Sequence, residues 1–226
     1  MRKLVLWGHP VEEYLEMFDL PSTALSTRWL EYGCGPSAVN AMQHARGQRV
    51  VSCDPLFQLD KLKLQLVVDE AFDHMVQQVR LVQHVFDFSR YGSLDALIQS
   101  RREGLSVFFK DYEQGVAEKR YLPVSEPLPF PDFSFDVALS SHHLFEDLDD
   151  QDVDFHITTI CELARVAKEV RIFPLIDRFG KPSSFLGPVL LGLQNLHYGV
   201  EVREVTYSFQ AKGNAMLRVW AELCQF

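Results

Sequence analysis

The 226-residue sequence predicts an α/β protein in which strands and helices alternate along one domain. An apolar strand, a glycine turn, a helix-length segment and a second apolar strand follow one another over residues 29–55. Segments of helical periodicity and short apolar runs then alternate through the middle of the chain. Two alternating segments at 200–209 and 216–223, separated by Lys212-Gly213-Asn214, predict a terminal β-hairpin.

The composition is acidic, with a formal net charge of −9 and 23% charged residues. Duplex nucleic acid and anionic membranes both require a basic surface, so this charge argues against them and favours a small-molecule or protein partner. The four scattered cysteines form no Cys-x-x-Cys pair, which favours reduced thiols and a cytoplasmic location over disulfides or zinc. The sequence shows no signal peptide, and no segment approaches the roughly 20 apolar residues of a membrane helix.

The N-terminal half predicts mostly helices after the first two strands. Apolar residues at helical spacing over 11–18 predict an initial helix, whose Tyr14 and Phe18 either face a ligand or pack in the core. Residues 58–86 predict one long or two consecutive amphipathic helices. Residues 94–116 continue in helical character, with a break expected at 101–104.

The stretch between the second and third strands is unusually long. About 65 residues separate Asp54 from Arg120, whereas a minimal βαβ unit needs about 30. The excess predicts a helical insertion at about 79–119 within a single domain over 1–226. Insertions of this kind either cap an active site or make a subunit contact, which leaves open a homodimer through this segment.

The C-terminal half continues the alternation of strands and helices. Residues 120–125 predict a short third strand that a proline ends early, and residues 135–141 predict a buried fourth strand. The further elements are a helix over 150–168, a strand over 170–175 and a helix over 184–198 that stops at Gly199.

The glycine turn distinguishes two classes of nucleotide ligand. Asp54 follows Gly33 by about 20 residues, which is the spacing of ribose-binding acids in βαβ units. An NAD fingerprint has a third glycine, which is missing after Gly35 at that spacing. Glu31, two positions before Gly33, would repel a pyrophosphate but attract a cationic ligand. The pattern therefore disfavours an NAD-dependent oxidoreductase.

Residues 31–37, Glu-Tyr-Gly-Cys-Gly-Pro-Ser, resemble motif I of class I S-adenosylmethionine (SAM) dependent methyltransferases, with Ser37 in place of the usual third glycine. Residues 128–137, Leu-Pro-Phe-Pro-Asp-Phe-Ser-Phe-Asp-Val, are similar to a second block of that family, which leads to the methyl-transfer face. Further segments along nearly the whole chain resemble an uncharacterised bacterial group of methyltransferase-like proteins. The resemblance implies a Rossmann-like, seven-stranded, mostly parallel sheet with an antiparallel last strand and helices on both faces.

The same resemblance implies SAM as the methyl donor and S-adenosylhomocysteine as its product. Gly33 and Gly35 then let the chain pass close under the methionine and ribose. Glu31 attracts the ammonium group, and Asp54 accepts hydrogen bonds from the ribose hydroxyls. The alternatives are an exposed strand-end acid for Glu31 and a turn-capping role for Asp54. The residues expected to bind the cofactor are Glu31, Gly33, Cys34, Gly35, Asp54, Pro55, Ser125, Glu126, Ser140 and Ser141.

The adenine contact departs from the family pattern. The family commonly places an Asp four residues before the Leu-Pro-Phe block, and this chain has Val124 there. Ser125, Glu126 or a main-chain carbonyl then takes over the contact with the adenine amino group.

Two adjacent histidines follow the fourth strand, at the edge where ligands of open α/β sheets bind. Either His142 or His143 suits a general base, and at most one is expected to face the site; we assign the role to His142. A capping or packing role is the alternative for this histidine. Glu146 is expected to be a solvated acid, and the sequence shows no ligand spacing typical of a metal site.

The sequence thus predicts a SAM-dependent methyltransferase that acts on a small-molecule or protein acceptor. The alternative is a non-catalytic SAM-binding or nucleoside-binding protein of the same fold. Val124 and the absence of the family's Pro-Gly-Gly turn after Lys168 favour this alternative, whereas the intact acids and glycines of residues 31–54 favour cofactor binding.

Overall fold

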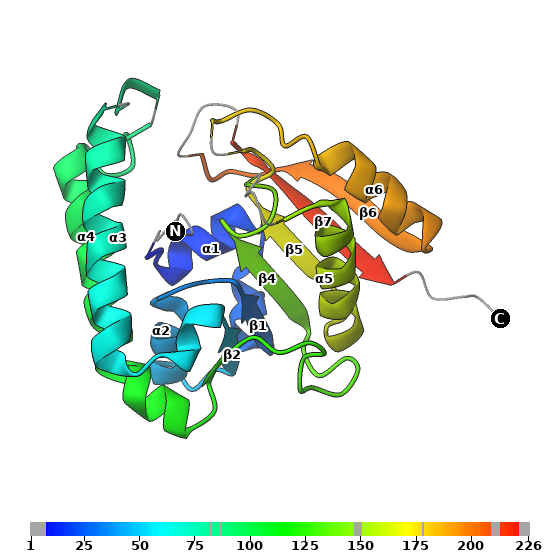
Figure 1. The fold of residues 1–226 in the computed structure, drawn as a ribbon, viewed down its shortest axis with the longest axis horizontal. Coiled ribbons are helices and arrows are strands. Elements are labelled where there is room, and N and C mark those ends of the chain that lie inside the picture. The colour runs from blue at the N-terminus through cyan, green and yellow to red at the C-terminus, as the bar shows by residue number, and fades with distance from the viewer. Residues whose placement is uncertain are drawn as a thin grey trace.

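The computed structural model describes residues 8–81, 83–85, 87–146, 151–177, 179–208 and 213–221. Within these residues, seven strands form one sheet in the order β3-β2-β1-β4-β5-β7-β6 (Figure 1). Strands β1 to β5 are parallel where they pair, and β7 is antiparallel to both β5 and β6. The predicted sheet is therefore confirmed. The strands are β1 (Trp29–Tyr32), β2 (Val50–Cys53), β3 (Tyr121–Leu122), β4 (Val137–Ser141), β5 (Val170–Phe173), β6 (Tyr198–Glu204) and β7 (Ala215–Ala221).

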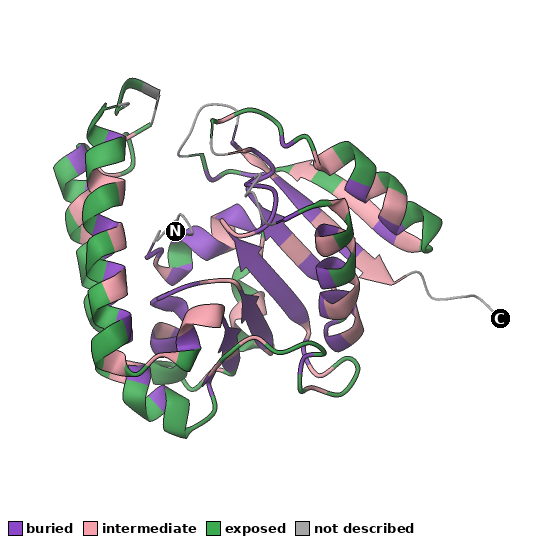
Figure 2. Cartoon of the chain, viewed as in Figure 1, coloured by how far each residue is buried: buried purple, intermediate pink, exposed green. Residues whose placement is uncertain are grey.

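Helices cover both faces of this sheet, because successive strand residues point to opposite sides. Leu30 packs with the helices of one face, whereas its neighbour Trp29 packs with those of the other. The strands in the middle of the sheet are buried along their length (Figure 2). The helices are α1 (Val11–Met17), α2 (Val39–Ala45), α3 (Lys61–Leu81), α4 (Leu94–Ala117), α5 (Val153–Val166) and α6 (Leu186–Asn195).

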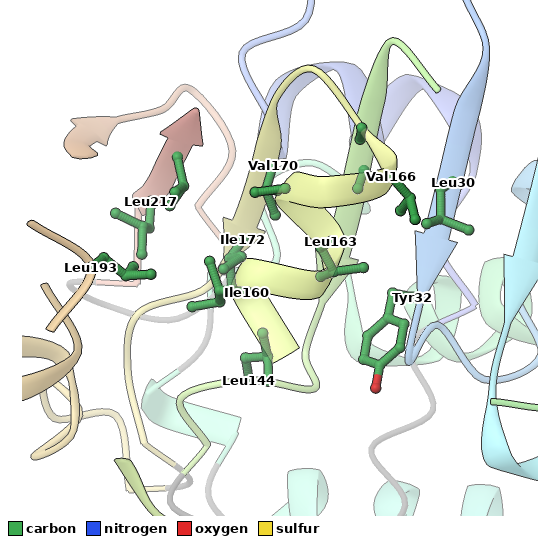
Figure 3. Close-up of a cluster of buried hydrophobic side chains, with 14 of the residues drawn as sticks. Leu30, Tyr32, Leu144, Ile160, Leu163, Val166, Val170, Ile172, Leu193 and Leu217 are labelled. Carbon is green, nitrogen blue, oxygen red and sulfur yellow. The ribbon is translucent and has the colours of Figure 1, made fainter. Parts of the chain in front are cut away.

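The larger core cluster lies between the sheet and helices α5 and α6. Ile160 and Leu163 of α5 and Leu193 of α6 face the sheet residues Val170 and Leu217 (Figure 3). Burying a side chain of this kind stabilises the fold by about 1.5–3 kcal/mol. Packing against these two helices therefore fixes the strands whose ends form the site described below.

Helices α3 and α4 form a separate unit beside the sheet (Figure 1). They pack on each other through Phe72 and Phe108, and α4 also contacts α2 and β3. The predicted insertion at about 79–119 falls on the end of α3 and on all of α4. Leu62 and Leu66 of α3 are 71% and 63% exposed. The boundaries of the insertion and a homodimer contact through it stay predictions.

Three sequence predictions about element ends are wrong. The helix expected over 184–198 ends at Asn195, and Tyr198 and Gly199 already belong to β6. The break expected at 101–104 is absent, because α4 runs through Gly104 without interruption. The strand expected over 200–209 ends at Glu204, after which the backbone of Val205 still bonds to Asn214 while Tyr207 turns inward and is buried. Lys212 of the predicted turn lies outside the described residues.

Position 104 of α4 needs glycine because the backbone of Gly8 lies against it. A Cβ at this position would be 2.7 Å from the carbonyl oxygen of Gly8, just before α1. We expect Gly104→Ala to lower the free energy of unfolding by about 1–3 kcal/mol through overpacking, despite the better helix propensity of alanine. Urea unfolding measures the change. Ser106→Ala, an exposed substitution in the same helix, should be neutral or slightly stabilising, and equal effects of both would contradict the steric explanation.

Candidate functional site

The glycine turn lies at the carboxyl end of β1, next to the end of β2. Gly33 and Gly35 have φ angles of +64° and +56°, a left-handed conformation that side chains rarely adopt. A Cβ at Gly33 would also overlap the ring of His143. Cys34 lies between the two glycines, where burial raises the pKa of its thiol well above the usual value, so the thiol is neutral. The turn therefore needs glycine at both positions.

Glu31 is fully buried in β1, so the alternative of an exposed strand-end acid is wrong. Its two carboxylate oxygens accept hydrogen bonds from the hydroxyls of Ser37, at 2.8 Å, and Ser52, at 2.6 Å. Ser52 in turn accepts a hydrogen bond from the side-chain amide of Asn40 at 2.8 Å. Burial raises the pKa of Glu31. The carboxyl group thus ties β1, β2 and the glycine turn together from inside.

Asp54 fastens the same turn from the end of β2. One carboxylate oxygen accepts the backbone N–H of Gly35 at 2.7 Å, and the other accepts that of Leu56 at 2.8 Å. Pro55 follows as the first residue of a short 3₁₀ helix, Pro55–Gln58, which Asp54 caps. The turn-capping role considered for Asp54 is therefore present. A carboxylate oxygen accepts about two hydrogen bonds.

A small cavity of about 110 Å³ lies between the end of β1, the chain after β3 and helix α5. Ser125 and Glu126 line it, and Tyr32 contributes the wall formed by β1. Val124 is partly buried against the core, which explains why this position is apolar. The remaining residues around the cavity are Leu128, Thr158, Thr159, Glu162 and Leu163.

Ser140 and Ser141 end strand β4 and are both buried. The hydroxyl of Ser141 lies 3.1 Å from that of Tyr14, which comes from α1. Tyr14 is 2% exposed, and Phe18 of the same helical segment is fully buried. Of the two roles considered for Phe18, the structure shows core packing. Tyr14 combines core packing with a polar contact to the end of β4.

The two histidines after β4 point in different directions, as the sequence predicts. His142 has a φ angle of +52°, so the backbone reverses there while its N–H bonds to the carbonyl of Phe173 at 2.8 Å. The ring of His143 lies against Gly33 and meets the ring of Tyr32 edge-on at 5.6 Å. His142 instead lies on the side of α1.

Glu146 is not the solvated acid that the sequence suggested. It is 6% exposed, and its carboxylate lies 3.5 Å from Nδ1 of His142. Positive φ angles at His142 and Phe145 fold the segment back on itself, which brings the acid inward. A run of acidic residues in a sequence does not indicate such local reversals of the backbone, so the sequence predicted an exposed Glu146.

No protein-family model matches the chain. The chain is 27% identical over 219 residues to the uncharacterized protein MJ0045 of Methanocaldococcus jannaschii, covering 96% of both chains. The methyltransferase domain of bacterial CtHen1 matches over 93% of this chain and 98% of its own, with a TM-score of 0.50 and 12% identity. A TehB-like SAM-dependent methyltransferase from Corynebacterium glutamicum matches over 96% and 90%, with a TM-score of 0.48 and 12% identity.

The likeness to the CtHen1 domain covers almost all of both chains, and the observed sheet is the one that the motif resemblance implies. The chain has the class I methyltransferase fold. In this methyltransferase fold the carboxyl edge of the parallel strands is the ligand-binding side. The glycine turn, Asp54, Ser141 and His142 all lie along that edge.

A buried cluster of three ionisable residues at the same edge was not predicted from the sequence. His9 Nδ1 lies 2.5 Å from the carboxylate of Glu13, and the guanidinium of Arg101 contacts both oxygens of that carboxylate at 2.9 and 3.3 Å. All three residues are 2% exposed or less. The spacing of four between His9 and Glu13 could have indicated a helical pair. Arg101 comes from α4, and no sequence signal connects it to them.

The buried group makes stability depend on pH. Burial and the charge of Arg101 lower the pKa of His9 from 6.5 to about 3. Below pH 6.5 the unfolded chain protonates this residue and the folded chain does not, so the unfolded state binds more protons and stability falls as the pH falls. We expect the free energy of unfolding to decrease by about 1.4 kcal/mol per pH unit below pH 6 from His9 alone.

Urea unfolding at pH 7, 6 and 5 measures this slope. His9→Gln should remove it between pH 6 and 5, because the folded and unfolded pKa values of Glu13, about 2 and 4.5, lie below that range. Equal slopes in the two proteins would contradict a neutral buried His9.

Within the described ranges, no group of three or more His, Cys, Asp or Glu side chains is arranged to hold a metal ion. None of the helices in the described part of the chain is both long and apolar enough to cross a membrane.

Proposed function

We propose that this protein is a SAM-dependent methyltransferase that acts on a small-molecule or protein acceptor. One observation carries the proposal. The left-handed glycine turn after β1 is fastened by Asp54, at the end of β2, on the ligand-binding edge of the methyltransferase fold. A turn held in this way presents backbone groups and a carboxylate together, which suits a nucleoside with a cationic substituent.

The residues at this edge fit SAM in their chemistry. Gly33, Cys34 and Gly35 supply a backbone surface without a bulky obstruction of their own, and Asp54 supplies acceptors for ribose hydroxyls. Both carboxylate oxygens of Glu31 already accept hydrogen bonds from Ser37 and Ser52. We therefore assign Glu31 a long-range electrostatic attraction for the ammonium group of SAM rather than a direct contact.

The other assigned contacts lie on either side of this turn. Ser125 and Glu126, beside the small cavity, are assigned to adenine, and Ser140 and Ser141 close the end of β4. Pro55 sets the direction of the chain after Asp54.

When bound, SAM supplies an electrophilic methyl group on a sulfonium, so the protein mainly has to align a nucleophile and exclude water. His142 is assigned the role of general base for an acceptor that has to lose a proton. The carboxylate of Glu146 lies 3.5 Å from Nδ1 of His142, on the loop that carries this histidine. Ser140 and Ser141 at the end of β4 and Tyr14 of α1 are buried on this side of the edge.

Calorimetric titration with SAM and with S-adenosylhomocysteine tests the cofactor. Micromolar binding, a free energy of about −8 kcal/mol, is expected for both ligands. NAD serves as the matched negative ligand, because the turn lacks the third glycine of its fingerprint. Binding of neither adenosyl compound would overturn the proposal.

Turnover is tested with methyl-labelled SAM and the small-molecule and protein fractions of a bacterial cell extract. Label should pass to one fraction, and His142→Gln should lower the rate by roughly 100-fold or more with cofactor affinity unchanged. A variant that loses affinity but keeps its rate per bound complex would make His142 a cofactor contact. Binding of SAM without transfer of label would favour the non-catalytic alternative.

A further inference from the structure

The imidazoles of His9 and His142 form a stacked pair at the ligand-binding edge. Their ring centroids lie 5.2 Å apart, and their planes differ by 10°. The ring of Tyr207 meets His9 edge-on at 5.9 Å, and the ring of Phe173 meets His142 edge-on at 5.8 Å. The pair is therefore held between aromatic side chains, and neither ring can turn without displacing a neighbour.

The two imidazoles have different surroundings. His9 is 2% exposed, and its Nδ1 faces Glu13, whose charge the guanidinium of Arg101 already balances. His142 has a side chain that is 14% exposed, and its Nδ1 faces the carboxylate of Glu146 at 3.5 Å. A protonated ring is favoured beside a carboxylate and disfavoured in a buried site next to an arginine. A proton is thus disfavoured on His9.

We propose that His9 is a positioning residue for His142, and that the pair serves an acceptor whose nucleophilic atom carries a removable proton, a hydroxyl or a thiol. The proposal rests on the proposed function. Burial lowers the pKa of His9 to about 3, so this ring stays neutral and donates its Nδ1–H to Glu13. A neutral ring stacked on His142 tolerates a charge there, whereas a second charged ring would oppose it.

The reaction of such an acceptor balances without any further reactant. The oxygen or sulfur of the acceptor forms a bond to the methyl carbon, and the bond between that carbon and the sulfonium sulfur breaks. The sulfur keeps the electron pair and becomes neutral, while the proton of the hydroxyl or thiol passes to His142. Acceptors that lack a removable proton, such as tertiary amines and thioethers, have no use for this imidazole pair.

Titratable and charged groups from several elements lie around His142 and His9. Helix α1 contributes Glu13 and Tyr14, and helix α4 contributes Arg101. His9 comes from the segment just before α1. Tyr207 approaches from the segment after β6, with Arg90 over its ring at 5.7 Å, and Glu146 lies on the loop of His142 itself.

Nuclear magnetic resonance of the imidazole nitrogens tests the proposal on the unmodified protein. His9→Gln and His142→Gln assign the two signals among the eight histidines of the chain. Between pH 5 and 8, His9 should remain in the neutral Nδ1–H form. A titrating His9, or the opposite tautomer, would overturn the positioning role.

Glu13→Gln tests the coupling between the two rings. Without the carboxylate, the charge of Arg101 acts on the two rings unbalanced, so the measured midpoint of the His142 signal should move to lower pH. Glu12→Gln is the matched control, since Glu12 lies on the outer side of the same helix and pairs with Arg46 at 3.2 Å. Equal midpoints of the His142 signal in Glu13→Gln and Glu12→Gln would contradict the coupling between the His9 and His142 rings.

Calorimetry with S-adenosylhomocysteine on the same samples separates the two hypotheses. No binding, with the histidine titrations as expected, would overturn the proposed function alone. Binding with a titrating His9 would overturn the positioning role alone. An acceptor from the labelled screen that carries a hydroxyl or thiol, with a rate that rises through the midpoint of His142, supports the class of substrate; a tertiary amine would overturn it.

Discussion

Replacing Arg101 by Met is expected to lower the free energy of unfolding by about 3–5 kcal/mol at pH 7. Arg101 is fully buried, and both oxygens of the Glu13 carboxylate receive its N–H groups. The arginine helps to hold the pKa of Glu13 at about 2, so the variant retains a buried carboxylate that has lost its main counter-charge. Urea unfolding at constant ionic strength measures the loss.

Arg102→Met provides the matched control for this substitution. Arg102 is the next residue of α4, is exposed, and lies 3.5 Å from Asp73. An exposed pair of this kind contributes only about 0–1 kcal/mol. A loss of less than about 1 kcal/mol in Arg101→Met would mean that Glu13 finds another partner or takes up a proton on folding. Partial rescue by Glu13→Gln in the same chain would identify the stranded carboxylate as the cause.

Replacing Asp54 by Asn is expected to weaken SAM binding by at least about 100-fold, because two hydrogen bonds to a charged group contribute about 3 kcal/mol or more. The same change lowers stability by about 2 kcal/mol. The amide nitrogen of asparagine must face one of the two backbone N–H groups that Asp54 now accepts, those of Gly35 and Leu56. Calorimetry and urea unfolding measure the two effects separately.

Asp60→Asn controls for the loss of an aspartate near the same loop. Asp60 is exposed and accepts the N–H of Lys63 at 2.9 Å, so this variant should lose at most a helix-capping contribution of about 1 kcal/mol. SAM affinity should not change. Unaltered SAM affinity in Asp54→Asn would reduce Asp54 to a turn-fastening residue and remove the main support for the cofactor assignment.

The parts of the site that could be predicted are those encoded by nearby residues. Gly33, Gly35 and Asp54 belong to one βαβ unit, in which the strands and the turn fix their relative positions. The opposed directions of His142 and His143 follow from their adjacency in the chain. The sheet followed for the same reason, since its strands and turns have local apolar and glycine patterns.

The parts that could not be predicted depend on contacts between distant segments. Arg101 meets Glu13 across 88 positions, and position 104 of α4 needs glycine because the carbonyl of Gly8 lies against it. The early end of β6 follows from Tyr207 turning toward His9, a contact that no periodicity encodes. A single sequence shows composition and spacing, whereas these features require knowledge of which surfaces meet.

The edges of the sheet constrain how copies of this protein can associate. One edge is β3, which has only two residues. The other edge is β6, where Glu201 and Arg203 pair with each other at 2.9 Å and Arg203 also reaches Asp19. Charged side chains on an edge strand oppose the addition of another strand, so growth of the sheet from molecule to molecule is disfavoured at both ends. Any self-association of the folded chain is therefore expected to use helical surfaces, and aggregation should require prior unfolding.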